Sequence, residues 1–160
     1  MENGSNPVTI NPPRGFFPTK VDDKGRLKLT SNFLWYLGGL QAKELFATSL
    51  DRSVAKLYSI PVWNRNVALL ENCGEKRTWG KDVLFLANEL GGDGELDNQG
   101  RILLPTNLRR LLKLENTTVW LEAFEGGINV YSQEVFEAKQ KKAQENLAEK
   151  LEYMENLGLK

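Results

Sequence analysis

The stretch VDDKGRLKL at residues 21–29 returns 75 residues later as LDNQGRILL at residues 96–104. The first aspartate, the glycine, the arginine and the last leucine are identical in the two copies. Matches continue downstream, because LYS at residues 57–59 corresponds to VYS at residues 130–132. A match of this length and order predicts an internal repeat, with one unit at about residues 15–63 and a second at about 90–136.

Each copy has the pattern of two short strands joined by a tight turn. Gly25 and Gly100 can adopt the positive φ that such a turn needs, and the carboxylates of Asp22 and Asp97 can accept backbone N–H groups across it. Helix-starting residues follow the returning strand, and two further strand-like runs come next. The runs are residues 44–48 and 55–58 in the first unit and 117–124 and 128–131 in the second. Each unit is therefore predicted as strand–turn–strand–helix–strand–turn–strand.

A unit of about 45 residues is too small to bury an adequate core alone, so we expect the two units to close on each other. The segment between them, residues 60–90, is predicted to be helical in two pieces with a break at residues 72–74. Beyond the second unit, apolar residues recur at helical spacing and predict one helix from Ser132 to about Leu157. We expect this helix to lie on the body of the protein or on a neighbouring subunit.

The composition excludes several classes of site. The chain of 160 residues has no histidine and one cysteine, Cys73, which leaves no imidazole-based catalysis, no histidine-containing zinc site and no internal disulfide. No nucleophile, metal cluster or phosphate-binding loop is evident, so we expect no enzyme activity, no cofactor, no metal and no catalytic residues. The chain also lacks a signal-peptide pattern and the run of about 20 apolar residues that spans a bilayer, so we expect a soluble, cytoplasmic protein.

The doubled Asp-x-x-Gly-Arg hairpin resembles the AbrB-type swapped-hairpin DNA-binding unit. Two copies in a chain of this length resemble the MraZ family of bacterial transcriptional regulators. The resemblance covers about residues 14–136: it includes Arg14 and Gly15, both hairpins, residues 57–63, and GRILLP at residues 100–105 with Arg109 four positions on. Thr30 and Leu34 depart from it, since the family tends to have proline and arginine there.

The resemblance implies the fold class and the domain organisation. The fold would be α+β, mainly β, with two AbrB-like repeats forming a pseudo-two-fold swapped-hairpin β-barrel that carries peripheral helices and a C-terminal helix. The expected parts are a flexible N-terminal arm (1–13), the first repeat (14–63), a helical bridge (64–93), the second repeat (94–136) and the C-terminal helix (137–160).

The resemblance also implies a function, which is sequence-specific regulation of transcription at short direct repeats in a promoter of a cell division and cell-wall gene cluster. The expected partners are double-stranded promoter DNA and further copies of the chain in a ring-like homo-oligomer. The expected location is cytoplasmic and nucleoid-associated, with no membrane partner. The DNA-binding candidates are Lys24, Arg26, Arg101, Lys28 and Arg14. The hairpin scaffold candidates are Asp22, Gly25, Asp97 and Gly100.

Two alternatives stand beside this interpretation. Arg26 could serve as a structural partner of the neighbouring aspartate rather than as a DNA contact. The barrel as a whole could be kept for oligomeric assembly or for binding another protein, as in the antidote half of a toxin–antidote pair, with DNA binding reduced or lost.

Charge separates the two repeats. The whole chain is balanced, with 21 lysine and arginine residues against 21 aspartate and glutamate residues. Residues 14–45 hold six cationic side chains against three acidic ones, whereas residues 95–136 hold four against six. The first repeat also has Lys24 and Lys28 where the second has Gln99 and Leu103. From this pattern we expect Arg26 to matter more than Arg101 for DNA binding, and we expect a neutral chain to bind DNA multivalently.

Overall fold

The computed structural model describes residues 10–160, so most of the predicted N-terminal arm lies outside the described residues. The strands are β1 (Phe16–Lys20), β2 (Arg26–Lys28), β3 (Glu44–Thr48), β4 (Ala55–Ser59), β5 (Gly92–Glu95), β6 (Arg101–Leu103), β7 (Thr118–Phe124) and β8 (Gly127–Ser132). The helices are α1 (Ser31–Gly39), α2 (Ile60–Glu71), α3 (Arg77–Leu90), α4 (Thr106–Leu111), α5 (Gln133–Gln144) and α6 (Leu147–Asn156), and a 3₁₀ turn, η1 (Gly74–Lys76), precedes α3.

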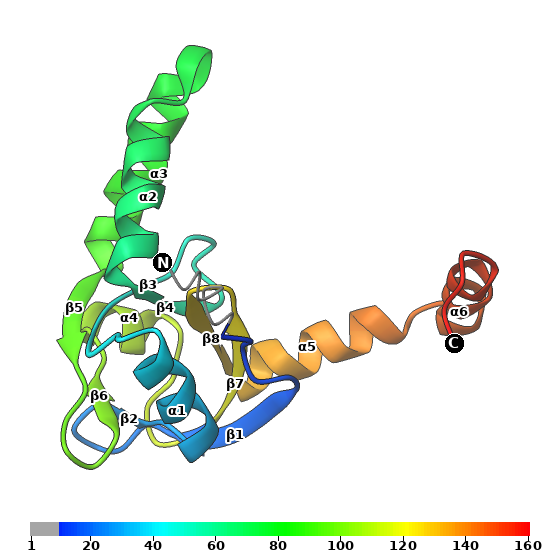
Figure 1. Ribbon diagram of the computed structural model, residues 1–160, viewed down its shortest axis with the longest axis horizontal. Helices are drawn as coiled ribbons and strands as arrows, with labels where there is room; N and C mark the ends of the chain where they lie inside the picture. The colour runs from blue at the N-terminus through cyan, green and yellow to red at the C-terminus, as the bar shows by residue number, and fades with distance from the viewer. Residues whose placement is uncertain (1–9) are drawn as a thin grey trace, which may run out of the picture.

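The two repeats exchange their N-terminal hairpins. Six strands form one sheet in the order β1-β7-β8-β4-β3-β5, and β2 and β6 form a second sheet. β1 of the first repeat pairs antiparallel with β7 of the second, and β5 of the second pairs antiparallel with β3 of the first. The tight turns between β1 and β2 and between β5 and β6 connect the two sheets (Figure 1). The predicted α+β, mainly β fold is confirmed.

One apolar core fills the space between the two sheets. Leu27 of β2 and Ile102 of β6 are fully buried, and they join one cluster with residues of β3, β4, β7 and β8. Phe33 of α1 and Leu108 of α4 are also fully buried in this cluster, so the two short helices cover it at equivalent places. Because residues of both repeats make up this core, neither repeat has a complete core alone.

A helical arm projects from the body (Figure 1). Helices α2 and α3 form it, and the interval between the Glu71 end of α2 and the Arg77 start of α3 includes the predicted break at residues 72–74. The two helices approach closely at Gly80, where an added Cβ would lie only 2.1 Å from the carbonyl oxygen of Leu70. Trp63 of α2 stacks on Phe46 of β3 at 4.5 Å between ring centroids, which fixes the base of the arm to the large sheet.

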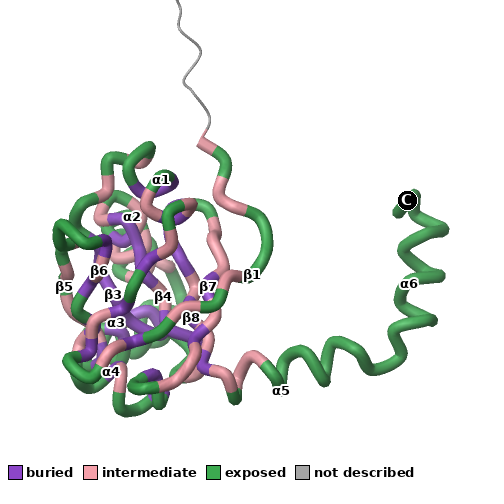
Figure 2. Tube along the Cα trace, turned by 90° about the horizontal axis from the view of Figure 1, so that it is seen from below, coloured by how far each residue is buried: buried purple, intermediate pink, exposed green. Residues whose placement is uncertain are grey.

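The C-terminal segment contains two helices rather than the single predicted one. Its N-cap is as expected, since Ser132 Oγ accepts a hydrogen bond from the backbone N–H of Val135 at 3.1 Å. The helix is interrupted at Asn146, because its φ of 55° is left-handed and incompatible with an α-helix. Asparagine adopts this conformation more readily than most residues. Residues 137–160 are exposed, and α6 lies away from the body (Figure 2). Of the two places expected for this segment, α6 therefore does not occupy the body of its own chain, which leaves a neighbouring subunit.

Within residues 10–160, no helix combines the length and the apolar character needed to cross a bilayer.

Candidate nucleic-acid interface

The two hairpin turns have the same backbone geometry. Gly25 and Gly100 have φ of 83° and 73°, and each donates its N–H to the carbonyl of the turn aspartate at 3.0 and 3.1 Å. Asp22 Oδ1 accepts from the backbone N–H groups of Lys24 and Arg26 at 3.0 and 2.8 Å. Asp97 Oδ1 makes the matching pair of contacts in the second turn, at 2.8 and 2.9 Å. Each aspartate therefore organises its turn from inside, and each glycine supplies the left-handed conformation.

The remaining carboxylate oxygen of each aspartate holds the arginine of its turn. Arg26 Nε lies 2.8 Å from Asp22 Oδ2, and Arg101 Nε lies 3.0 Å from Asp97 Oδ2. The structural ion pair considered from the sequence is thus present in both hairpins. It uses Nε alone, and within residues 10–160 no hydrogen bond engages the terminal nitrogens of either guanidinium. An arginine held in this way keeps a fixed direction and can still present two donors to an acceptor outside the protein.

The pKa values of both aspartates are lowered by these contacts. The backbone N–H of Arg26 is the main cause for Asp22, and the backbone N–H of Arg101 is the main cause for Asp97, each with a further contribution from the arginine side chain. Hydrogen bonds to an ionised carboxylate favour the ionised form, so both groups stay charged in the folded hairpin.

We expect this lowering to make stability depend on pH only in acid. A carboxyl group whose pKa is lower in the folded state than in the unfolded state stabilises the fold above the unfolded value, here 3.8, and loses that contribution as the pH falls through the folded pKa. The free energy of unfolding, measured by urea denaturation at a series of pH values, should therefore change little between pH 7 and 5 and fall below pH 4.

A double variant, Asp22→Asn with Asp97→Asn, should be less stable at pH 7 and show a shallower fall in acid. Asp23→Asn, which removes the exposed carboxylate that follows Asp22 within the first turn, is the control. An unchanged acid slope in the double variant would contradict the assigned role of the two aspartates.

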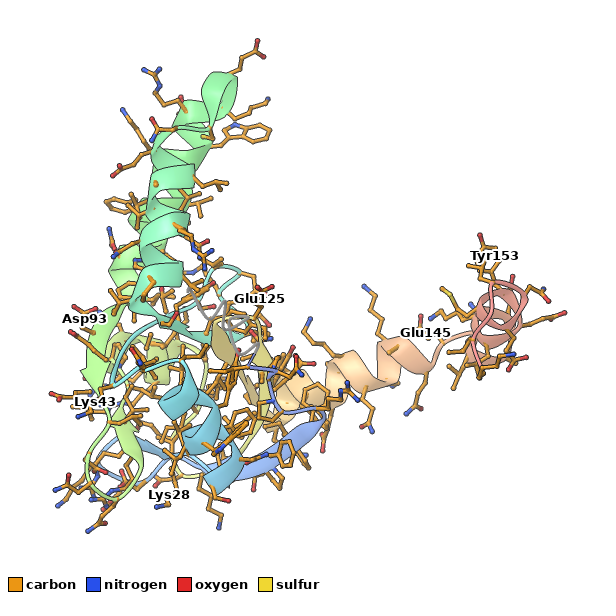
Figure 3. All side chains as sticks on the ribbon, viewed as in Figure 1. Lys28, Lys43, Asp93, Glu125, Glu145 and Tyr153 are labelled. Atoms are coloured by element: carbon orange, nitrogen blue, oxygen red, sulfur yellow. The ribbon has the colours of Figure 1, made fainter. Side chains whose placement is uncertain are left out.

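The strands that leave the turns form a two-stranded ribbon with a cationic outer face. β2 and β6 pair antiparallel with Leu27 opposite Ile102, and both of these side chains point into the core. Side chains alternate between the faces of a strand, so the neighbours of these two residues point outward. The outward side chains are Arg26, Lys28, Arg101 and Leu103. Lys28 is labelled at this edge of the molecule in Figure 3, among other nitrogen-tipped side chains.

The ribbon pairing redistributes the charge that the sequence assigned to the first repeat. Lys28 lies directly opposite Arg101, and Arg26 lies opposite Leu103. The Lys28 ammonium donates to the backbone carbonyl of Gln99 in the turn of the second repeat. Lys28 therefore adds its charge beside Arg101, which reduces the charge difference between the two hairpins, while Lys24 stays with the first turn.

An arginine from the second repeat supports the first turn. Arg109 in α4 lies over Gly25: its Nη1 donates to the backbone carbonyl of Lys24 at 3.3 Å and its Nη2 donates to Thr106 Oγ1 at 3.1 Å. Its Nε lies 3.1 Å from Glu115 Oε1, and only 12% of the side chain is exposed. The side chain thus ties the first hairpin to the helix of the other repeat.

The equivalent support of the second turn is apolar. Leu34 of α1 is 75 positions before Arg109, and a Cβ added at Gly100 would lie 2.6 Å from its Cδ1. The backbone contacts beside the two supports match, since Leu29 N–H donates to Gly100 O at 2.9 Å and Leu104 N–H donates to Gly25 O at 3.0 Å. Leu34, where the family tends to have arginine, therefore gives the second turn an apolar support. The first turn has a charged support, although the backbones of the two turns match.

The structure brings together four of the five predicted DNA-binding residues. Arg26, Lys28 and Arg101 share the outer face of the ribbon, and the exposed Lys24 stands at the tip of the first turn. Arg14 does not join them. It precedes the Phe16 end of β1, whereas the turn follows the Lys20 end of the same strand.

Two participants were not identified as site residues from the sequence. The sequence shows Leu103 only as an uncharged counterpart of Lys28, although its side chain is 56% exposed on the ribbon face. The family resemblance includes Arg109 without indicating that it supports a turn. When the repeats are aligned at their offset of 75 residues, Arg109 pairs with Leu34. This replacement of a leucine by an arginine is the sequence feature that distinguishes the position.

The site consists of cationic hydrogen-bond donors on a two-stranded ribbon. Between residues 10 and 160, no three cysteine, aspartate or glutamate side chains come close enough to hold a metal ion. The chemistry available at this surface is the binding of anionic groups and of hydrogen-bond acceptors, for which fixed guanidinium groups are suited.

Comparison with known proteins gives a consistent result. Residues 93–156 match the family model described as "MraZ protein, putative antitoxin-like". A protein of Acidobacterium capsulatum named "Transcriptional regulator MraZ" is 35% identical over 106 residues, which are 66% of this chain and 73% of that protein. Proteins of the same name from Koribacter versatilis and from a Thermoanaerobacter species are 32% identical over 103 residues and 27% identical over 147 residues. These alignments cover 64% and 91% of this chain and 70% and 98% of the two relatives.

Proposed function

The chain belongs to the MraZ family, and we propose that it is a transcriptional regulator that binds short direct repeats in double-stranded promoter DNA. The observation that carries the proposal is the β2–β6 ribbon, whose outer face presents two oriented arginines and a lysine. By the family resemblance, the promoter belongs to a cell division and cell-wall gene cluster. The protein acts in the cytoplasm, associated with the nucleoid, by binding rather than by catalysis.

A two-stranded ribbon fits into the major groove of B-DNA, where base edges differ in their donors and acceptors. Arg26 and Arg101 can each place their terminal nitrogens on the O6 and N7 acceptors of guanine. Lys24 at the turn and Lys28 at the ribbon edge are compact charges suited to the phosphates on either side. Asp22, Asp97 and the two turn glycines hold this arrangement in place, and the Arg109 side chain supports the first turn through its hydrogen bond to the Lys24 carbonyl.

Charge balance favours binding by several subunits at once. The chain has no net charge, and phosphate neutralisation supplies much of the affinity of a DNA-binding protein, so one ribbon alone binds weakly. Linking several ribbons in a ring-like homo-oligomer makes each later contact effectively intramolecular and raises the overall affinity. Direct repeats are the target that such a series of identically oriented ribbons matches.

The proposal is tested by selecting fragments of the source genome with the purified full-length protein and sequencing those retained. The expected result is a short motif that recurs in one orientation upstream of the cell division and cell-wall genes. The double variant Arg26→Ala with Arg101→Ala is the control and should lose the motif. Retention of no fragment, by a protein shown to be folded, would support the alternative of a protein-binding, antidote-like barrel.

Affinity for the selected DNA should fall steeply as salt rises. Each phosphate neutralised by Lys24, Lys28 or another cation contributes about −0.9 to the slope of log affinity against log salt concentration. Titration of labelled promoter DNA at several salt concentrations measures this slope, and Lys24→Ala should reduce it by about one. Affinity that hardly changes with salt would contradict a phosphate-contacting surface.

A further inference from the structure

We propose that helix α6 of one chain docks in the groove between α5 and β1 of the next chain and joins the subunits head to tail. The inference rests on the proposed homo-oligomer and specifies the surfaces that build it. Two features of the described chain carry it: an apolar groove at the surface of the body and an amphipathic helix that projects away from that body.

The groove is bordered by aromatic side chains at the root of α5. It has a volume of about 370 Å³ and is lined by Phe16, Tyr131, Phe136, Lys139, Gln140 and Ala143. The Phe16 ring packs edge-on against Tyr131 and Phe136 at 5.5 and 5.1 Å between centroids, and the opposite face of this cluster is closed by Trp120, which stacks on Phe136 at 4.5 Å. Phe16 remains 43% exposed, so the cluster is formed but one side of it is open.

Helix α6 carries an apolar stripe that its own chain does not cover. Leu147, Leu151 and Met154 recur at spacings of four and three, and they are 46%, 41% and 49% exposed. Figures 1 and 2 show the helix away from the barrel, joined to it only through α5. Glu145 and the left-handed Asn146 break the path between the two helices and turn α6 off the line of α5. The stripe therefore faces solvent in a single chain.

The charges beside this groove are opposite to those of α6. The C-terminal half of α5 carries Lys139, Lys141 and Lys142, and Lys139 lines the groove itself. Helix α6 carries Glu149, Glu152 and Glu155 against one cation, Lys150. An acidic helix with an apolar stripe thus complements an apolar groove with a lysine edge. Such complementarity favours the correct partner over a second acidic helix, which would repel it.

This contact joins the subunits head to tail. The helix of one subunit enters the groove of the next, so the two sides of the interface are different surfaces, and the contact is heterologous. Heterologous contacts generate rings when the rotation closes, whereas a two-fold contact would give a closed dimer. Successive subunits then present their β2–β6 ribbons in the same orientation, which is the arrangement that direct repeats require and that a two-fold dimer cannot supply.

Charge reversal on the two surfaces tests the contact. One variant, Lys139→Glu with Lys142→Glu, alters the groove, and the other, Glu152→Lys with Glu155→Lys, alters the helix. We expect each variant alone to show a lower mass by light scattering than the unaltered chain, because like charges then meet at every contact. We expect an equal mixture of the two variants to recover the higher mass, because every groove then faces a helix of opposite charge.

Two results would overturn the inference. In one, the groove variant keeps the full mass when alone. Pairing of α6 with α6 of another chain would produce this result, because the groove variant leaves α6 unaltered. In the other, the mixture stays as small as its parts although each variant is folded by circular dichroism.

Cross-linking between differently labelled chains gives an independent measurement. In a Cys73→Ser background, one chain carries Ala143→Cys in the groove and the other carries Leu151→Cys on the helix. Oxidation of the mixture should give a cross-linked pair containing one chain of each kind. Leu69→Cys on the outer surface of the helical arm, where the leucine is 66% exposed, replaces Ala143→Cys in the control and should give little product. Equal product from both mixtures would contradict a specific contact.

The mass of the unaltered protein keeps this test separate from the proposed function. If the chain binds promoter DNA and is an oligomer but fails the charge-reversal and cross-linking tests, only the assignment of the interface is wrong. If it forms the cross-linked series and binds no DNA, the interface holds and the proposed function fails. Truncation after Gln144, which removes α6 and leaves the groove, should lower the mass and leave the melting temperature of the barrel unchanged.

Discussion

Arg26→Ala and Arg101→Ala should lower the affinity for the promoter by similar factors, each about 5- to 150-fold, and both should relax the sequence preference. This range corresponds to the roughly 1–3 kcal/mol typical of an arginine that reads a base edge. The two losses should be similar because the arginines occupy equivalent places, each held through Nε by the aspartate of its own turn. Lys28, one of the two lysines that favoured Arg26 in the sequence, lies opposite Arg101 in the ribbon.

Titration of labelled promoter DNA with each variant measures these losses. Arg77→Ala is the matched control, because Arg77 is an exposed arginine at the start of α3 and its removal changes the net charge equally. Circular dichroism must show that the hairpin variants are folded, since each loses an ion pair within its turn. A markedly larger loss at Arg26 would mean that the repeats bind DNA unequally, as their charge along the sequence suggested.

Gly25→Ala should destabilise the protein by about 2–3 kcal/mol, which for a chain of this size lowers the melting temperature by roughly 4–12 °C. The φ of 83° costs a residue with a side chain about 1–2 kcal/mol. The new methyl group would also lie 1.4 Å from Arg109 Nη1, so the guanidinium must leave its hydrogen bonds to Lys24 and Thr106, at about 1 kcal/mol. The first turn would then lose its support from the second repeat.

A double-mutant cycle separates strain from lost support. With Arg109→Leu already present, Gly25→Ala should cost only the backbone strain, about 1–2 kcal/mol, because there is no guanidinium to displace. Gly100→Ala is the comparison in the other repeat, where the methyl group meets the flexible end of Leu34. Calorimetry or urea denaturation gives the free energies. Strict additivity of Gly25→Ala and Arg109→Leu would show that Arg109 does not support the turn.

The two hairpins are thus equal in their turns and different in their supports. The first turn is supported by a charged side chain with three polar contacts and the second by an aliphatic one. Arg109→Leu removes the polar contacts that hold the first turn in place, whereas an apolar replacement of similar size at Leu34 removes none. We therefore expect Arg109→Leu to weaken promoter binding more than such a replacement at Leu34, with titration of labelled DNA as the measurement.

The sequence alone determined the repeat, the turns and the class of the fold. Asp22 with Gly25, and Asp97 with Gly100, predict their turns because aspartate and glycine act locally, through hydrogen bonds and a positive φ within five residues. The alternation of side chains between the two faces of a strand is also a local property, and it places the buried Leu27 and Ile102 between outward-facing neighbours. The small size of each unit predicted that the two would share one core.

The tertiary structure decided how residues far apart in the chain combine. The pairing of β2 with β6 joins segments 75 residues apart, and it places Lys28 directly opposite Arg101. Arg109 and Gly25 are 84 positions apart, and their contact depends on the exchange of hairpins between repeats. The break at Asn146 interrupts a helical pattern that continues across it, so periodicity predicted one helix where the backbone makes two. Local rules fix turns and strand faces, but register between distant strands is set by the packing of the whole core, which no single segment of the sequence contains.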